Sequence, residues 1–125
     1  MNAAPFGLAV SHPMTGVSVV TVSGDLEMTT TPALLDVVRA ELAAGAQCLL
    51  IDLDAVDFLG SAGMTALLEA SRALAGAVPG AMLHLSGTSR RVVHRPLEML
   101  GLLPLFIVHA DLDEALAKIE SAERA

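Results

Sequence analysis

The sequence predicts an α/β domain built on a mixed, mostly parallel β-sheet of about five strands with about four α-helices. Short apolar runs rich in β-branched residues alternate along the chain with segments whose apolar residues follow helical spacing. The strand–helix–strand connections after residue 24 imply parallel strands with right-handed crossovers. The 125 residues fit one domain, so we expect a single domain over 1–125 with a structured core over about 6–120.

The first half of the chain predicts three strands and one helix. Phe6–Val10 and Val17–Val22 form a hairpin around a turn over residues 11–16, which makes the sheet mixed. The segment Thr29–Gly45 begins with hydroxyl residues and a proline and ends in a glycine, which predicts a helix with these boundaries. Cys48–Leu53 is an almost unbroken apolar run, which is typical of a central strand covered on both faces.

The second half of the chain predicts two more strands and three helices. The order is a loop over 58–63, a helix over 64–75, a strand over 81–85, a helix over 88–100, a strand over 105–108 and a closing helix. Thr88 caps the second of these helices, and Pro96 kinks or restarts it because proline cannot donate the intrahelical hydrogen bond. Asp111–Glu114 has capping-box spacing, and Glu114 and Lys118 lie four residues apart on the last helix.

The charge of the chain argues against two classes of partner. Its 7 basic and 14 acidic residues give a net charge of −7, whereas nucleic acids and anionic membranes are bound through cations. Although 54% of the residues are hydrophobic, no apolar segment reaches the ~20 residues of a membrane span, and no signal peptide is apparent. We therefore expect a cytoplasmic protein that binds neither nucleic acid nor membrane.

The reactive residue types do not form a catalytic or metal-binding motif. The four histidines are too far apart in the sequence to act as local zinc ligands: His12, His84, His94 and His109. The lone Cys48 lies in a buried strand pattern, where it is a small core hydrophobe. The chain has neither the Gly-x-Ser-x-Gly elbow of hydrolases nor a phosphate-binding loop. We expect no enzyme, no cofactor and no metal site.

Acidic residues gather at or just after the predicted strand ends, where functional residues collect in open α/β sheets: Asp25, Glu27, Asp52, Asp54 and Asp57. One interpretation is a magnesium-dependent phosphoacceptor pocket as in response-regulator receivers, a family that has an acidic pair after the first strand and a lysine after a late strand. Residues 1–24 contain no acid and the late strands contain no lysine. The sequence therefore favours solvated loop carboxylates for most of these acids.

Ser61 stands in a glycine-flanked loop just before a strongly amphipathic helix. It has two interpretations. As an N-cap, its hydroxyl would accept a hydrogen bond from a helix amide. As a phosphorylation site, it would lie where glycines let a kinase approach and where the helix amides tolerate a phosphate. Phosphorylation would then add a charge of roughly −2 to the surface without unfolding the protein.

Three segments together resemble one known family: Val22–Glu27, Leu49–Leu53 and Asp57–Met64. The tail agrees through Met99–Leu102, Phe106–Val108 and Asp111–Leu116. The chain resembles the bacterial anti-sigma factor antagonists of the STAS domain family (sulphate transporter and anti-sigma factor antagonist) over nearly its whole length. The loop of this family commonly reads Asp-Ser-Ser/Thr-Gly. Here Gly60 replaces the aspartate and Ala62 replaces the second hydroxyl, which leaves Ser61 as the one candidate phosphoacceptor in this loop.

The resemblance implies a partner switch. The unphosphorylated antagonist binds an anti-sigma factor, which is also a serine kinase, and frees the sigma factor. Phosphorylation of Ser61 breaks this complex, and a phosphoserine phosphatase resets it. The residues that the resemblance assigns to partner binding are Asp25, Glu27, Met28, Thr29, Gly60, Ser61, Ala62, Gly63 and Met64.

Two alternatives remain for the function and two for a basic cluster. The chain could be a non-switching STAS module, as a scaffold or as an accessory subunit of a transporter, or it could be a nucleotide-binding domain. The cluster of Arg90, Arg91, His94 and Arg95 is a solvated helix face or a site for an anion or a partner.

Overall fold

The computed structural model describes residues 5–124, which form one five-stranded sheet with helices on both faces. The strands are β1 (Gly7–Met14), β2 (Val17–Leu26), β3 (Cys48–Leu59), β4 (His84–Ser86) and β5 (Ile107–His109). The helices are α1 (Thr31–Ala43), α2 (Ser61–Ala77), α3 (Arg91–Met99) and α4 (Leu112–Arg124), with a 3₁₀ turn, η1 (Leu103–Leu105). The strand order is β1-β2-β3-β4-β5, with β1 antiparallel to β2 and the other pairs parallel. The predicted fold class is confirmed.

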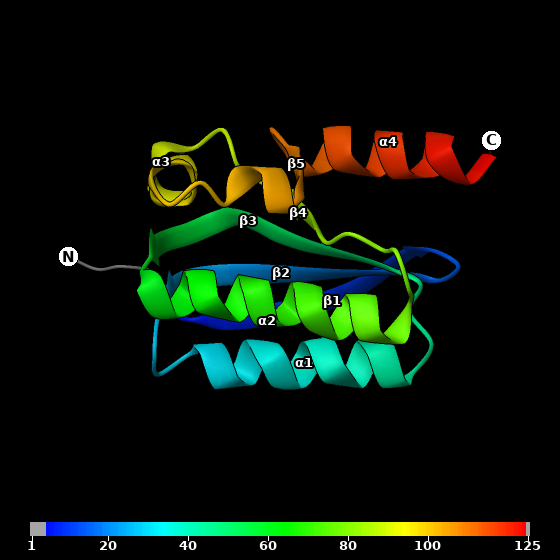
Figure 1. Ribbon diagram of the computed structural model, residues 1–125, viewed down its shortest axis with the longest axis horizontal. Coiled ribbons are helices and arrows are strands. Elements are labelled where there is room, and N and C mark those ends of the chain that lie inside the picture. Colours follow the sequence, from blue (N-terminus) through cyan, green and yellow to red (C-terminus); the bar gives the residue numbers. More distant parts are fainter. Residues whose placement is uncertain (1–4, 125) are drawn as a thin grey trace.

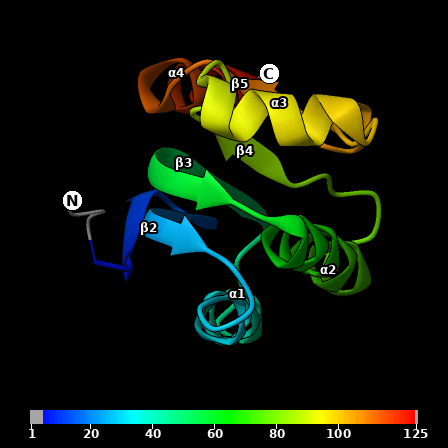
Figure 2. The ribbon, with the colours of Figure 1, turned by 90° about the vertical axis from the view of Figure 1, so that its left-hand side faces the viewer.

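The helices form two layers around the sheet (Figure 1). Helices α1 and α2 lie on one face, and α3 and α4 lie on the other, as the end-on view also shows (Figure 2). Alternation along β2 divides its side chains between the layers, because successive residues of a strand point to opposite faces. Val20 and Val22 enter the main hydrophobic core, whereas Val17 and Val19 enter a smaller cluster with Ala115 and Ile119 of α4. None of the helices within residues 5–124 is long and apolar enough to cross a membrane.

The first three strands are longer than predicted. β1 continues through the predicted turn to Met14, with a register shift between Ser11 and Met14, and only Thr15 and Gly16 turn. β2 and β3 run on to Leu26 and Leu59 because their parallel pairing continues across two irregularities. The loop positions expected for most of the acids near strand ends are therefore wrong for Asp25, Asp54 and Asp57, which lie in strands, whereas Asp52 lies in β3 as the predicted strand Cys48–Leu53 requires. Of the acids expected at strand ends, Glu27 lies in a loop, directly after β2.

The second half of the chain also departs from the prediction in detail. β4 pairs only over His84–Ser86, and Leu105 belongs to η1, so that β5 begins at Ile107. Thr88 does not cap α3. Its hydroxyl instead donates to the His109 carbonyl at 2.8 Å, and Arg90 occupies the N-cap position. α3 passes through Pro96 without restarting, because the missing proline N–H removes only one bond from a helix held by buried Val93 and Leu97.

The start of α4 confirms the predicted capping box. The Glu114 amide donates to Asp111 Oδ1 at 2.9 Å, and Glu114 Oε2 accepts from the Ala110 amide at 3.2 Å. Lys118 Nζ donates to Glu114 Oε1 at 2.9 Å, which is the expected i, i+4 pair. Cys48 is half-buried and packs against the smaller cluster, and burial raises the pKa of its thiol to about 11. A thiol in this state packs as an apolar side chain.

Candidate functional site

Ser61 is the first residue of α2 and lies where β3 passes into that helix. Its side chain is exposed, and no hydrogen bond within residues 5–124 involves its hydroxyl. The N-cap position belongs to Gly60, whose backbone is extended, so the interpretation of Ser61 as the N-cap residue is wrong. A residue one place inside the helix cannot direct its hydroxyl back to the amides of N2 and N3 as a cap does. The Ser61 oxygen therefore stands free at the surface.

The carboxyl ends of β2 and β3 bring two loops together at one end of the sheet, which we call the Ser61 end (Figure 2). Asp25 pairs with Phe58 and Leu26 pairs with Leu59. The two strands therefore end side by side, and β2 leads to α1 while β3 leads to α2. The predicted partner residues of the first loop and those around Ser61 are in this way brought to the same end of the molecule.

Glycines hold the turn of α2 tightly against β2. The Gly60 amide donates to the Leu26 carbonyl at 3.3 Å, and its own carbonyl accepts from the Met64 amide at 3.0 Å. A Cβ on Gly63 would lie 2.6 Å from the Leu26 carbonyl oxygen, so only glycine fits there. Gly63 and Met64 are buried, which gives both of them a supporting role beneath the exposed Ser61.

The loop after β2 presents the remaining predicted residues. Glu27, Met28 and Thr29 are exposed, and the Met28 side chain is 77% exposed. Thr30 shapes this loop, since its hydroxyl donates to the Asp25 carbonyl at 2.8 Å and accepts from the Glu27 amide at 2.9 Å. Asp25, Gly60 and Ala62 are half-buried. Their contact with a partner stays a prediction.

The electrostatics around Ser61 suit an added anion. The first amides of a helix lack intrahelical acceptors and lie at the positive end of the helix dipole. α2 has 17 residues and no acidic residue in its first turn. A phosphate on Ser61 would therefore meet amide donors and no nearby helix carboxylate.

A groove next to the junction of β3 and α2 was not predicted from the sequence. It has a volume of about 620 Å³, and its lining is Phe58, Leu59, Arg91, Val92, Arg95, Pro96 and Met99. We call it the Phe58–Met99 groove. Its two walls, the end of β3 and the exposed side of α3, are distant in the sequence, and the sheet brings them together. The sequence signalled one side of the groove, through Arg91 and Arg95 of the predicted basic cluster, whereas the exposure of Phe58 is seen only in the structure.

The predicted basic cluster divides into two kinds of side chain. Arg90 Nη1 donates to the carbonyls of Leu53 and Val56 at 3.0 and 2.9 Å, which ties α3 to β3. His94 Nε2 lies 3.4 Å from Glu98. Arg91 and Arg95 are exposed on the groove and take part in no ion pair within residues 5–124.

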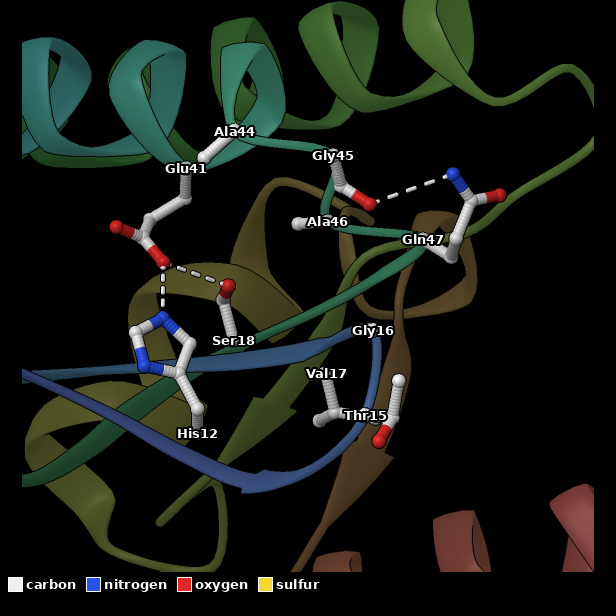
Figure 3. A pocket seen from close by; sticks show the side chains of 10 residues that line it. All are labelled: His12, Thr15, Gly16, Val17, Ser18, Glu41, Ala44, Gly45, Ala46 and Gln47. Carbon is white, nitrogen blue, oxygen red and sulfur yellow. Dashed lines mark hydrogen bonds and ion pairs between the residues drawn. The ribbon is translucent and has the colours of Figure 1, made fainter.

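A second pocket lies at the opposite end of the molecule (Figure 3), between the β1–β2 turn and the end of α1. Glu41 Oε1 lies 2.6 Å from His12 Nε2 and accepts from the Ser18 hydroxyl at 2.7 Å. These two contacts, with the Ser18 bond the larger cause, lower the pKa of the Glu41 carboxyl. The pocket is about 380 Å³ and its polar centre is already hydrogen-bonded internally.

Three further titratable groups contact other side chains within the fold. Asp52 is buried and accepts from the Ser86 hydroxyl at 2.9 Å and from the Asp54 amide at 3.2 Å. His84 and His109 stack with ring centroids 5.2 Å apart. Within residues 5–124, no three His, Cys, Asp or Glu side chains converge to hold a metal ion.

Comparison with known proteins gives consistent matches. The sequence model of the STAS domain matches residues 12–115. The anti-sigma-F factor antagonist RsfB of Mycobacterium tuberculosis is 30% identical over 104 residues, which cover 83% of this chain and 82% of that protein. The crystal structure of an anti-sigma factor antagonist from Mycobacterium paratuberculosis is 34% identical with a TM-score of 0.79, over 95% of this chain and 99% of that chain. Phosphorylated SpoIIAA of Bacillus shares the fold, with 18% identity and a TM-score of 0.68 over 90% and 99% of the chains.

Proposed function

The chain belongs to the STAS domain family, as its motifs predicted, and we propose that it is an anti-sigma factor antagonist switched by phosphorylation of Ser61. In its unphosphorylated form it binds an anti-sigma factor and frees the sigma factor. The anti-sigma factor, acting as a serine kinase, phosphorylates Ser61 and thereby loses its antagonist. A phosphoserine phosphatase restores the binding form. This role requires that the protein works in the cytoplasm as a binder and kinase substrate, with no catalysis of its own.

One observation carries this proposal, the free and exposed hydroxyl of Ser61 at the start of α2. Because the Ser61 hydroxyl has no hydrogen bond within residues 5–124, a kinase can phosphorylate it without breaking a contact of the fold. The related RsfB, named as an anti-sigma-F factor antagonist, supports the assignment of the partner class. The same fold carries a phosphoryl group in SpoIIAA.

The physical basis of the switch is a change in charge at an interface. The exposed Glu27, Met28 and Thr29 adjoin Ser61 at the Ser61 end and form, with Gly60 and Ala62, a surface for a partner. A neutral hydroxyl can be buried against a partner at low cost. A phosphate of roughly −2 cannot, since its desolvation would need new cationic partners at the interface. Phosphorylation therefore weakens binding while the fold stays intact.

The test uses Ser61→Asp, Ser61→Ala and a matched control, Ser121→Asp, which adds the same charge on an exposed position of α4. Affinity for the anti-sigma factor of the source organism is measured by calorimetry without ATP. We expect Ser61→Asp to bind at least a hundredfold more weakly, and Ser61→Ala and Ser121→Asp to bind like the wild type. With ATP, mass spectrometry should find the phosphate on Ser61. Equal affinity of the two Ser61 variants, or phosphorylation of another residue, would contradict the proposal.

A further inference from the structure

The Phe58–Met99 groove exposes apolar surface that the fold itself does not use. The side chain of Phe58 is 50% exposed and that of Met99 is 69% exposed. Leu59, Val92 and Pro96 complete the apolar part of the lining. Large apolar side chains gathered in one hollow, and not scattered singly, are typical of surfaces that bind another molecule.

Two guanidinium groups line the same groove. Arg91 and Arg95 are exposed and lie four residues apart on α3, so they project from one side of that helix. Unlike Arg90, neither makes an ion pair or hydrogen bond within residues 5–124. The rest of the chain is acidic, with a net charge of −7. The groove is therefore a local positive surface on a negative protein, and its charge complements an acidic occupant.

The groove also adjoins the junction of β3 and α2, which carries Ser61. Phe58 and Leu59 line the groove. The Phe58 ring also lies against Gly60, because a Cβ added to Gly60 would lie 2.8 Å from Phe58 Cε2. Ser61 follows Leu59 by two residues, so their Cα atoms lie within about 7.6 Å. A partner that covers the Ser61 hydroxyl is thus positioned to reach the groove.

We propose that the Phe58–Met99 groove binds a segment of the anti-sigma factor that combines apolar side chains with carboxylates. This inference rests on the proposed function and adds a second contact to it. The apolar side chains of the segment fill the space between Phe58 and Met99, and its carboxylates pair with Arg91 and Arg95. A phosphate on Ser61 brings roughly −2 beside this pair of contacts, so that it repels the acidic segment as well as disturbing the loop.

The first test reverses the charge of the groove. Arg91→Glu and Arg95→Glu are compared with Arg39→Glu, which changes the net charge equally at an exposed position of α1, in the opposite helix layer. The probe is the anti-sigma factor that binds the wild-type protein, with affinity measured by calorimetry. We expect each groove variant to raise Kd at least tenfold and Arg39→Glu to raise it less than twofold.

The second test removes apolar surface. Met99→Ser is compared with Met82→Ser, since Met82 is also exposed but precedes β4, away from the Ser61 end. We expect at least a fivefold rise in Kd for Met99→Ser and less than twofold for Met82→Ser. If the groove variants bind like their controls while Ser61→Asp does not bind, the groove inference is overturned and the proposed function stands. If the wild-type protein binds no anti-sigma factor, both are overturned.

Discussion

An added methyl group at Gly63 directly tests how closely the first turn of α2, which carries Ser61, packs against β2. Gly63 lies in the first turn of α2, is buried, and faces the backbone at the end of β2. In Gly63→Ala, the new Cβ would stand 2.6 Å from the Leu26 carbonyl oxygen and 2.8 Å from Leu59 Cδ1. Leu59 can rotate away, but a backbone oxygen inside a paired strand cannot. The variant must therefore move α2 away from the sheet.

The expected size of this effect follows from two opposing contributions. Overpacking of a tight interior site costs about 1–3 kcal/mol. Replacing glycine by alanine in a helix contributes up to about 1 kcal/mol in the other direction. We expect the free energy of unfolding to fall by about 1–2 kcal/mol, which lowers Tm by about 4–8 °C for a domain of this size.

Gly76→Ala supplies the matched control, because Gly76 lies in the same helix and a Cβ there meets nothing within 4 Å. We expect this variant to be more stable than the wild type by about 0.5–1 kcal/mol. Urea unfolding followed by circular dichroism measures both variants, with unchanged m-values as the check on two-state behaviour. A Gly63→Ala protein as stable as Gly76→Ala would refute the close packing of α2 on Leu26.

Two further predictions concern the face of the sheet under α4. Burial lowers the pKa of His84 to about 4 and, with Lys118 nearby, also lowers that of His109, with Glu114 opposing. An unfolded histidine titrates near 6.5, so the unfolded state binds more protons between pH 6.5 and 4, and stability must fall as the pH falls through this window. Because His84 is only partly buried, solvent screening reduces this effect, and between pH 7 and 5 we expect a loss of about 1 kcal/mol, measured by urea unfolding. The loss should be clearly smaller in His84→Gln, and an equal pH dependence of stability in variant and wild type would contradict the prediction. Asp111→Ala removes the acceptor of the Glu114 amide and should cost about 1 kcal/mol, whereas equal thermal melts of variant and wild type would show that the cap is dispensable.

The order of strands and helices could be predicted because each element carries its own periodicity. The valines of β2 and the capping box at Asp111 are local signals, and the structure agrees with both. The position of Ser61 near a helix start was equally local. Whether Ser61 caps the helix was not a local matter, since Gly60 takes the N-cap position and donates to the Leu26 carbonyl of the neighbouring strand.

The ends of β2 and β3 and the groove depend on contacts between distant segments. Asp25 pairs with Phe58 after a register shift, which the pattern of a single strand does not reveal. Because this pairing continues, both strands extend beyond the apolar runs from which they were predicted. The groove likewise requires Phe58 and Met99 to meet across the interface of β3 and α3. Arg90 looked like its neighbours in the sequence, yet it alone reaches two strand carbonyls.

The charge of the whole chain and the charge of the groove work against each other, and this opposition determines which partners can bind. A net charge of −7 makes copies of this protein repel one another, which opposes nonspecific self-association through the exposed Phe58 and Met99. Arg91 and Arg95 reverse the sign only where those apolar side chains lie. A basic partner is drawn to the general surface but meets two guanidinium groups at the groove that form no ion pair within residues 5–124, whereas an acidic partner is favoured at the groove. Specificity then comes from a difference between two surfaces of one molecule, and in the proposed switch a phosphate on Ser61 would reduce that difference by adding negative charge beside the groove.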